Sequence, residues 1–170
     1  MKKVLFITVL CLAAGTIYAQ QEKGDQILRF NGSYSKYGEG DGTLSLNIKA
    51  GRFLTKNVET GLETSLMTSA SFVNTSYGFY GTYNFLTKDA KMVPYAGVRA
   101  SLTSTQFSYT NPLTGSETTT KNNYAAAGLY GGLRYFLSEK VNIDTGLSYD
   151  FGKINILMWN VGLGIIIGQK

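Results

Sequence analysis

Hydrophobic and polar residues alternate with a period of two along almost the whole chain after Asp25, and no stretch shows a convincing helical period. The alternating segments span residues 26–35, 43–53, 57–67, 75–86, 92–103, 123–137, 141–151 and 154–168. Each has at least the roughly 9–11 residues that a tilted β-strand needs to cross a membrane. The pattern therefore predicts an all-β fold of eight strands.

The connections between these segments differ in length. Short ones around 55–57, 87–89 and 138–140 alternate with mostly longer ones at 36–42, 68–74 and 103–122, although the last connection, near 152–153, is short. Short turns at one end and longer loops at the other are typical of outer-membrane barrels. This alternation of short and longer connections predicts that both termini lie on the periplasmic, short-turn side.

One face of each predicted strand is apolar. It carries Leu44, Leu46, Ile48 and Ala50; Tyr77, Phe79, Tyr83 and Phe85; Val141, Ile143, Leu147 and Tyr149; and Leu157, Trp159, Val161, Leu163, Ile165 and Ile167. Aromatic residues stand near the strand ends of this face: Phe30, Phe85 and Tyr135 toward the short turns, and Tyr34, Tyr77, Tyr149 and Phe151 toward the loops. These positions predict two interfacial girdles. Periodicity alone is compatible with lipid or with a dry core on this face.

The opposite face carries balanced charges and many glycines. The charged residues are Arg29, Lys49, Glu59, Glu63, Arg99, Arg134, Asp144 and Asp150, and the glycines are Gly51, Gly61, Gly78, Gly97, Gly128, Gly132, Gly146, Gly162 and Gly164. Glycine weakens a strand and packs nothing, so a water-facing exterior has no use for it. An eight-stranded barrel has an interior only just wide enough for side chains. We therefore expect this face to line a narrow polar lumen and the apolar face to contact outer-membrane lipid.

The N-terminus has the order of a secretory signal peptide. Lys2 and Lys3 precede an apolar run that ends near Ala14, and a small residue, Ala19, stands before a polar stretch. We expect cleavage after Ala19, which gives a signal peptide over 1–19 and a barrel domain over 20–170. The only cysteine, Cys11, lies within the signal peptide, so the mature chain would have no disulfide.

Net charge gives no support to nucleic-acid binding. The chain carries +5, and two of these charges belong to Lys2 and Lys3, so the mature chain would carry about +3 without any basic run.

Three stretches, 51–61 (GRFLTKNVETG), 93–97 (VPYAG) and 132–138 (GLRYFLS), carry a family likeness. In them the chain resembles the small outer-membrane β-barrel family that includes OmpX, OmpW and the membrane domain of OmpA. The resemblance implies an eight-stranded antiparallel up-and-down transmembrane β-barrel in the bacterial outer membrane. It also implies the outer-membrane assembly machinery as a partner. The last strand resembles the family's assembly signal at Asn160, Gly162, Ile165 and Ile167, but the chain ends in Gly168-Gln169-Lys170 instead of the usual aromatic residue.

The sequence contains no histidine. Outer-membrane barrels that are enzymes use a histidine as the base for a serine or a water molecule. We therefore expect no catalytic activity, and no sequence pattern indicates a cofactor or a metal site.

The inward charges are the strongest candidates for a specific role. Buried charges are tolerated when they are paired, since an isolated one costs several kcal/mol to desolvate. We expect Arg29, Lys49, Arg99 and Arg134 to pair with Glu59, Glu63, Asp144 and Asp150, either as a structural plug or as a gate.

The sequence thus predicts an integral outer-membrane protein with a structural or surface-interaction role. Its Ser/Thr-rich loop at 103–121 is a candidate site for an extracellular ligand. Two alternatives stay open: a narrow channel for small solutes, and a soluble periplasmic, lipocalin-like carrier whose apolar face points inward around a ligand.

Overall fold

The computed structural model describes residues 21–35, 42–70, 72–86, 91–110, 117–153 and 155–168. The signal peptide predicted at 1–19 lies outside these residues. The structure contains eight strands: β1 (Gln26–Ser35), β2 (Thr43–Phe53), β3 (Val58–Thr68), β4 (Phe72–Asn84), β5 (Met92–Thr110), β6 (Glu117–Phe136), β7 (Val141–Phe151) and β8 (Ile156–Ile167). Within the described residues no helix is long and apolar enough to span a membrane.

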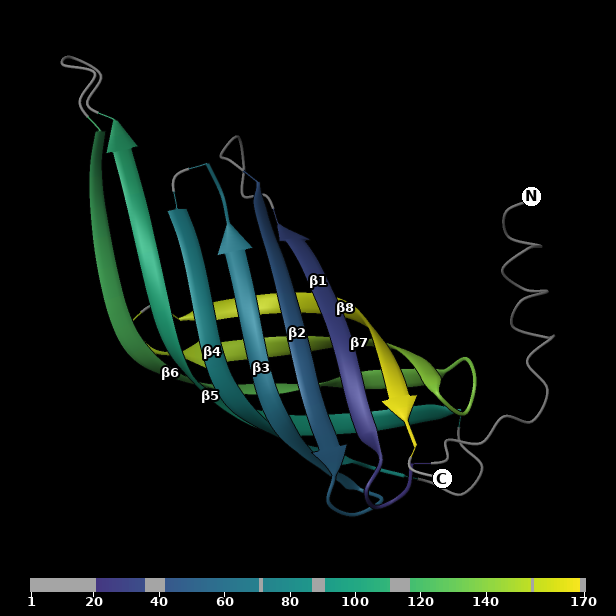
Figure 1. The fold of residues 1–170 in the computed structure, drawn as a ribbon. Helices are drawn as coiled ribbons and strands as arrows, with labels where there is room; N and C mark the ends of the chain where they lie inside the picture. The colour runs from purple at the N-terminus through teal and green to yellow at the C-terminus, as the bar shows by residue number, and fades with distance from the viewer. Residues whose placement is uncertain are drawn as a thin grey trace, which may run out of the picture.

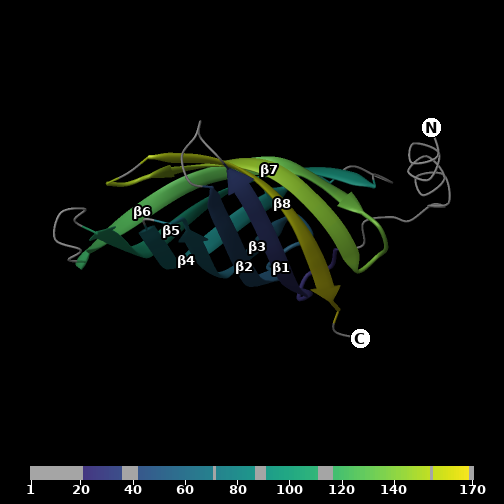
Figure 2. The ribbon, with the colours of Figure 1, turned by 90° about the horizontal axis from the view of Figure 1, so that it is seen from above.

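The strands form one closed barrel in chain order. Each strand pairs antiparallel with the next, and β8 returns to β1 with a register from Gln26↔Ile167 to Gly32↔Val161. Figures 1 and 2 show how β1–β4 form one wall of the barrel, how β5 and β6 curve round from it, and how β7 and β8 close the barrel on the other side. This topology confirms the predicted eight-stranded antiparallel up-and-down transmembrane β-barrel.

Two of the predicted long loops are wrong. β4 begins at Phe72, which pairs with Phe107, so most of the loop predicted at 68–74 is strand. Much of the loop predicted at 103–122 is also strand, because β5 and β6 stay paired up to Thr110↔Glu117. These segments are mostly polar, with isolated apolar residues such as Phe72, Val73 and Phe107, so no sustained apolar alternation marks them. Their β-branched threonines nevertheless favour extended backbone.

The lengths of the connections do not distinguish the two ends of the barrel, contrary to the prediction. One end has connections 54–57, 85–91 and 137–140, and the other has 36–42, 69–71, 111–116 and 152–155. The asymmetry lies in strand length instead. β5 and β6, of 19 and 20 residues, extend beyond their neighbours and form a projecting hairpin, the β5–β6 hairpin (Figure 1). We call this end of the barrel the loop side and the other the turn side.

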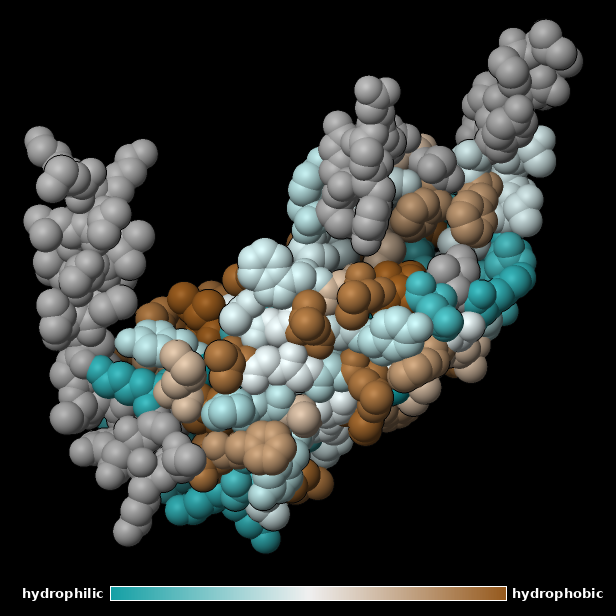
Figure 3. Space-filling model, turned by 180° about the vertical axis from the view of Figure 1, so that it is seen from behind, coloured by the Kyte–Doolittle hydropathy of each residue, from teal (hydrophilic) through white to brown (hydrophobic). Residues whose placement is uncertain are grey.

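The apolar face points outward. Its largest side chains are among the most exposed of the described residues: Leu102 is 71% exposed, Phe79 70% and Trp159 66%. Figure 3 shows hydrophobic side chains spread over the middle of the barrel, with hydrophilic residues gathered toward its two ends. Such a band suits the hydrocarbon core of a bilayer. The lipocalin-like alternative is therefore wrong, because it requires the apolar face to line the interior.

Candidate functional site

The eight charged residues expected in the lumen all lie on the inner face of the barrel, at alternate positions of six strands. They form two groups. The turn-side cluster contains Arg29, Glu59, Arg134 and Asp144, and the loop-side cluster contains Lys49, Glu63, Arg99 and Asp150. Each cluster holds two cations and two anions, so each is neutral by formal charge.

Arg29 is the centre of the turn-side cluster. Its Nη2 and Nε donate to the two carboxylate oxygens of Glu59 at 2.7 and 3.2 Å, and its Nη1 donates to Asp144 Oδ2 at 2.8 Å. The fork of a guanidinium matches a carboxylate in this two-bond geometry. Arg134 Nη1 lies 3.5 Å from Glu59 Oε2. The Glu59 side chain has no exposed surface and the Arg134 side chain only 2%, so this cluster is shielded from bulk solvent.

Neutral polar side chains complete the turn-side cluster. The Tyr80 hydroxyl donates to Glu59 Oε1 at 2.8 Å. Arg134 Nη1 donates to Asn84 Oδ1 at 2.6 Å, and its guanidinium lies 5.1 Å from the centroid of the Tyr95 ring. These contacts reduce the cost of burying the charges, although Arg134 Nε is buried without a hydrogen-bond partner among the described residues.

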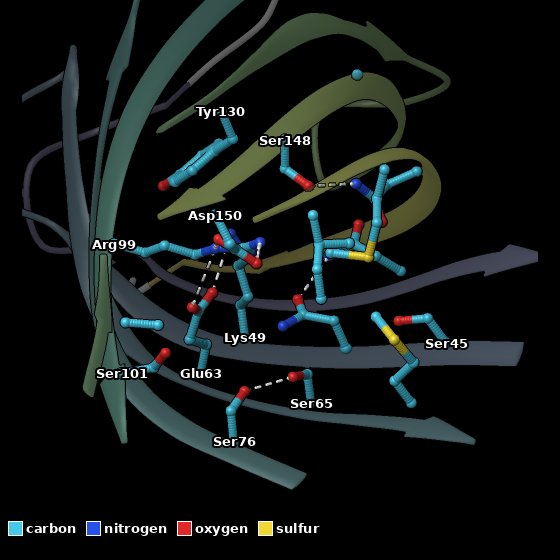
Figure 4. A pocket seen from close by; sticks show the side chains of 18 of the residues that line it. Ser45, Lys49, Glu63, Ser65, Ser76, Arg99, Ser101, Tyr130, Ser148 and Asp150 are labelled. Carbon is cyan, nitrogen blue, oxygen red and sulfur yellow. Dashed lines mark hydrogen bonds and ion pairs between the residues drawn. The ribbon is translucent and has the colours of Figure 1, made fainter. Parts of the chain in front are cut away.

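The loop-side cluster is less completely buried. Arg99 donates from Nε and Nη2 to the Asp150 carboxylate at 2.7 and 2.5 Å. Glu63 lies between two cations, 3.2 Å from Lys49 Nζ and 4.0 Å from Arg99 Nε. Lys49 Nζ also stands 3.9 Å from the centroid of the Tyr130 ring. Figure 4 shows these side chains converging in the lumen, where the Asp150 side chain retains 22% exposure.

A glycine makes the Arg99–Asp150 pair possible. Arg99 on β5 is in register with Gly128 on β6, which is in register with Asp150 on β7. A Cβ at Gly128 would collide with Asp150 Oδ1 and come within 2.9 Å of Arg99 Nε. Arg99 therefore reaches across one strand to its partner because that strand has no side chain there.

A polar cavity of about 80 Å³ runs along the lumen toward the loop side, and side chains of both clusters line it, including Arg29, Arg134 and Asp144 of the turn-side cluster. Hydroxyls from several strands line it, including Ser45, Ser65, Ser76, Ser101 and Ser148 (Figure 4). A space of this size holds a few water molecules. It is too small for a typical solute, because ligand pockets are several times larger.

An apolar layer closes the turn side of the lumen, and the sequence analysis missed it. It consists of the buried residues Ile27, Phe53, Val93, Phe136 and Ile166, with Leu86 packed against them. The signal was available in the alternation, because Ile27 and Phe136 stand two residues from Arg29 and Arg134 and so share their face.

The lumen tyrosines were also missed. Tyr80, Tyr95 and Tyr130 occupy inner positions, and the glycines provide their space: a side chain at Gly97 would collide with the Tyr130 ring, and one at Gly51 with the Tyr80 hydroxyl.

The four residues of the predicted assembly signal divide between the two faces of β8. Asn160 and Gly162 point inward, and the Asn160 amide donates to Ser148 Oγ at 3.0 Å. Ile165 and Ile167 point outward and are 37% and 54% exposed. Their recognition by the assembly machinery stays a prediction.

Small bacterial barrels are among the solved structures that are similar to this chain. The N-terminal β-barrel domain of Pseudomonas aeruginosa OprF aligns with a TM-score of 0.63 at 21% identity, over 87% of this chain and 100% of that one. Neisserial surface protein A aligns with a TM-score of 0.61 at 18% identity, over 83% and 95%. Ail, the attachment invasion locus protein of Yersinia pestis, aligns with a TM-score of 0.57 at 12% identity, over 85% and 99%. At these identities the likeness shows the fold alone.

A family assignment comes from the sequence itself. No curated protein matches the chain. The model of the Opacity family of porin proteins, however, matches residues 24–169, which include every strand of the barrel. Together with the outer-membrane barrels to which the structure is similar, this match identifies the chain as a member of the Opacity family of outer-membrane porin proteins.

Proposed function

We propose that this protein is a closed, non-conducting outer-membrane barrel that serves as a rigid scaffold for an outer interaction surface, the β5–β6 hairpin. The observation that carries the proposal is the sequence of layers inside the barrel. An apolar layer at the turn side is followed by a neutral, deeply buried ion cluster and then by a second neutral cluster, and a small polar cavity borders both clusters. An ion crossing this lumen would have to displace each layer in turn.

The turn-side layers give the strongest support for closure. Phe136 has no exposed surface, and Phe53 and Val93 are each 1% exposed. Arg29, directly beside this layer, spends all three of its donor nitrogens on Glu59 and Asp144. Opening a path here would leave buried charges without partners, and a buried unpaired charge raises the free energy by several kcal/mol.

A narrow channel is the second candidate, and one observation favours it. The Arg99 and Asp150 side chains border the cavity and are 12% and 22% exposed. Water can therefore solvate these two charges if they separate, so the loop-side cluster is the part of the lumen most able to rearrange. The channel would still require the apolar layer to move.

Export and assembly belong to the same proposal. Cleavage after Ala19 would release the barrel to the periplasm, and the assembly machinery would recognise β8 through Asn160, Gly162, Ile165 and Ile167. The outward apolar band supports a stable contact with outer-membrane lipid. We assign the protein no catalytic activity, since its lumen charges are paired with one another and it has no histidine.

Conductance in a planar lipid bilayer tests the proposal. The refolded wild-type barrel should give no discrete current steps. A barrel carrying Arg29→Ala, Phe53→Ala and Phe136→Ala, which removes the side chains that fill the turn side, should give steps if it folds, as judged by gel mobility without boiling. Regular steps from the wild type would contradict closure and support the channel instead.

A further inference from the structure

One side of β6 has no neighbouring strand in its outer part. β6 pairs with β5 along its whole length, up to Thr110↔Glu117. Its pairing with β7 begins only at Ala127↔Phe151. Residues 117–126 of β6 therefore form a free strand edge in the described structure, and Figure 1 shows this part of β6 rising beside β5 beyond the ends of β7 and β8. We call it the β6 edge.

The register identifies the backbone groups that the β6 edge presents. Phe136 N–H donates toward β5, to Lys91 O, and Leu137 N–H donates toward β7, to Val141 O. Backbone groups alternate in direction along a strand, and the β5–β6 register runs without a bulge from Met92↔Tyr135 to Thr110↔Glu117. Odd-numbered residues of β6 therefore direct their N–H and C=O groups away from β5. On the β6 edge these include Thr119, Lys121 and Asn123.

The β6 edge lacks most of the features that protect an edge strand from pairing. It contains no proline and no bulge, and three consecutive threonines, Thr118–Thr120, favour extended backbone. The side chains of these threonines are exposed. The edge also lies beyond Phe151, an exposed residue that the sequence predicts in the loop-side aromatic girdle, so we expect water and not lipid around it.

The charge beside the middle of the β6 edge is positive, whereas the acidic Glu117 stands at its outer end. Lys121 on the edge and Lys153 just after β7 are both exposed, and Lys153 Nζ lies 3.5 Å from Asn122 Oδ1, which places its ammonium next to the edge. Among the described residues no acidic side chain forms an ion pair with either lysine. Carboxylates on a strand that pairs with this edge would therefore be attracted to the two lysines.

We infer that the β6 edge binds an extended acidic segment of another polypeptide by strand addition, with backbone hydrogen bonds to Thr119, Lys121 and Asn123 and with carboxylates beside Lys121 and Lys153. Main-chain pairing provides the affinity in this mode of recognition, and the side chains provide the selectivity. The inference rests on the proposed function in one respect, namely that the barrel holds the β5–β6 hairpin outside the membrane.

A direct test uses the refolded barrel in lipid nanodiscs and a fluorescent peptide of about seven residues in which threonine and glutamate alternate. The peptide should bind, as measured by anisotropy. Thr119→Pro removes an edge N–H but leaves the β5 ladder intact, and it should weaken binding about tenfold. Thr119→Val, the matched control, keeps both the N–H and the strand propensity and should bind as the wild type does. Gel mobility without boiling reports whether each variant is folded.

Two further comparisons separate pairing from simple charge attraction. A peptide with N-methylated backbone amides on alternate residues should lose binding, because it cannot form the ladder. Lys121→Gln should weaken binding of the acidic peptide several-fold at low salt and much less at high salt.

The inference is overturned if the wild type does not bind the acidic peptide, if Thr119→Pro binds as well as Thr119→Val, or if the N-methylated peptide binds equally. Barrels that cross-link to one another through Cys substituted at Asn123, without binding the peptide, would replace the acidic segment by a second copy of this chain. These results are independent of conductance, so a conducting barrel that binds the peptide would refute closure and leave the inference standing.

Discussion

Glu59→Gln tests the energetic role of the turn-side cluster. The Glu59 carboxylate accepts two hydrogen bonds from Arg29 and one from the Tyr80 hydroxyl, and it lies within ion-pair distance of Arg134. Replacing it by an amide of the same size keeps the packing but removes the negative charge. Asp144 then remains as the only anion of the cluster, facing two buried guanidinium groups.

The magnitude follows from the burial of the cluster. Its side chains are at most 6% exposed, so water cannot compensate the lost charge. Removing one partner of a buried ion pair typically costs about 3–5 kcal/mol. We expect a loss of this size in the free energy of unfolding. Such a loss is a large fraction of the roughly 5–15 kcal/mol that stabilises a typical domain.

The assay is urea-dependent unfolding in phospholipid vesicles, followed by tryptophan fluorescence. Trp159 is the only tryptophan of the chain and lies on the outer face with 66% exposure, so its emission reports contact with lipid. Glu139→Gln, in the exposed turn between β6 and β7, is the matched control and should change stability by less than about 0.5 kcal/mol.

The double variant Glu59→Gln/Arg134→Gln separates charge from shape. It returns the cluster to neutrality with the Arg29–Asp144 pair, whose closest atoms are 2.8 Å apart. We expect it to be more stable than Glu59→Gln alone. A Glu59→Gln barrel within about 1 kcal/mol of the wild type, or a double variant less stable than the single one, would show that the charge of Glu59 does not stabilise the turn-side cluster.

Three further substitutions test other parts of the barrel in the same unfolding assay. Leu147→Arg places a charge on the lipid face and should lower the free energy of unfolding by about 2–4 kcal/mol if it lies near the bilayer midplane. The lumen change Ser148→Ala loses only the hydrogen bond from Asn160 and should lower it by about 1 kcal/mol. Equal losses would mean that the two faces are assigned wrongly. Gly128→Val should cost about 1–3 kcal/mol, because its side chain would collide with the Arg99–Asp150 pair, and a neutral result would show that the pair does not need this gap. Phe136→Ala should cost about 3–5 kcal/mol by opening a cavity in the apolar layer, and a loss below about 1 kcal/mol would mean that the layer is poorly packed.

Much of the membrane part of the fold could be predicted from the sequence. The period-two pattern predicted the bounds of β1, β2 and β7 as the structure has them, since one face of each strand meets lipid and the other meets the lumen. The outer ends of β5 and β6 could not be predicted in this way. These ends carry few apolar residues, as we expect for strands that project from the bilayer into water, so the alternation fades although the strands continue to Thr110 and Glu117.

The lumen could be predicted in composition but not in arrangement. Alternation places Arg29, Lys49 and Arg99 on the inner face, yet the partner of each depends on the stagger between strands. Lys49 lies beside its cross-strand neighbour Glu63, whereas Arg99 reaches over Gly128 to Asp150 two strands away. A single sequence contains the alternation within a strand but not the stagger that decides such pairs.

The central claim is that the lumen is open to water on the loop side and closed on the turn side. Labelling of a cysteine at Ser101, which lines the cavity, tests it most directly in proteoliposomes of known barrel orientation, with Cys11 replaced by Ser. Leu102→Cys on the lipid face is the control and should resist a membrane-impermeant thiol reagent from either side. We expect Ser101→Cys to react when the reagent is added on the loop side and to stay unmodified when it is added on the turn side. Equal reaction from both sides would contradict a closed barrel.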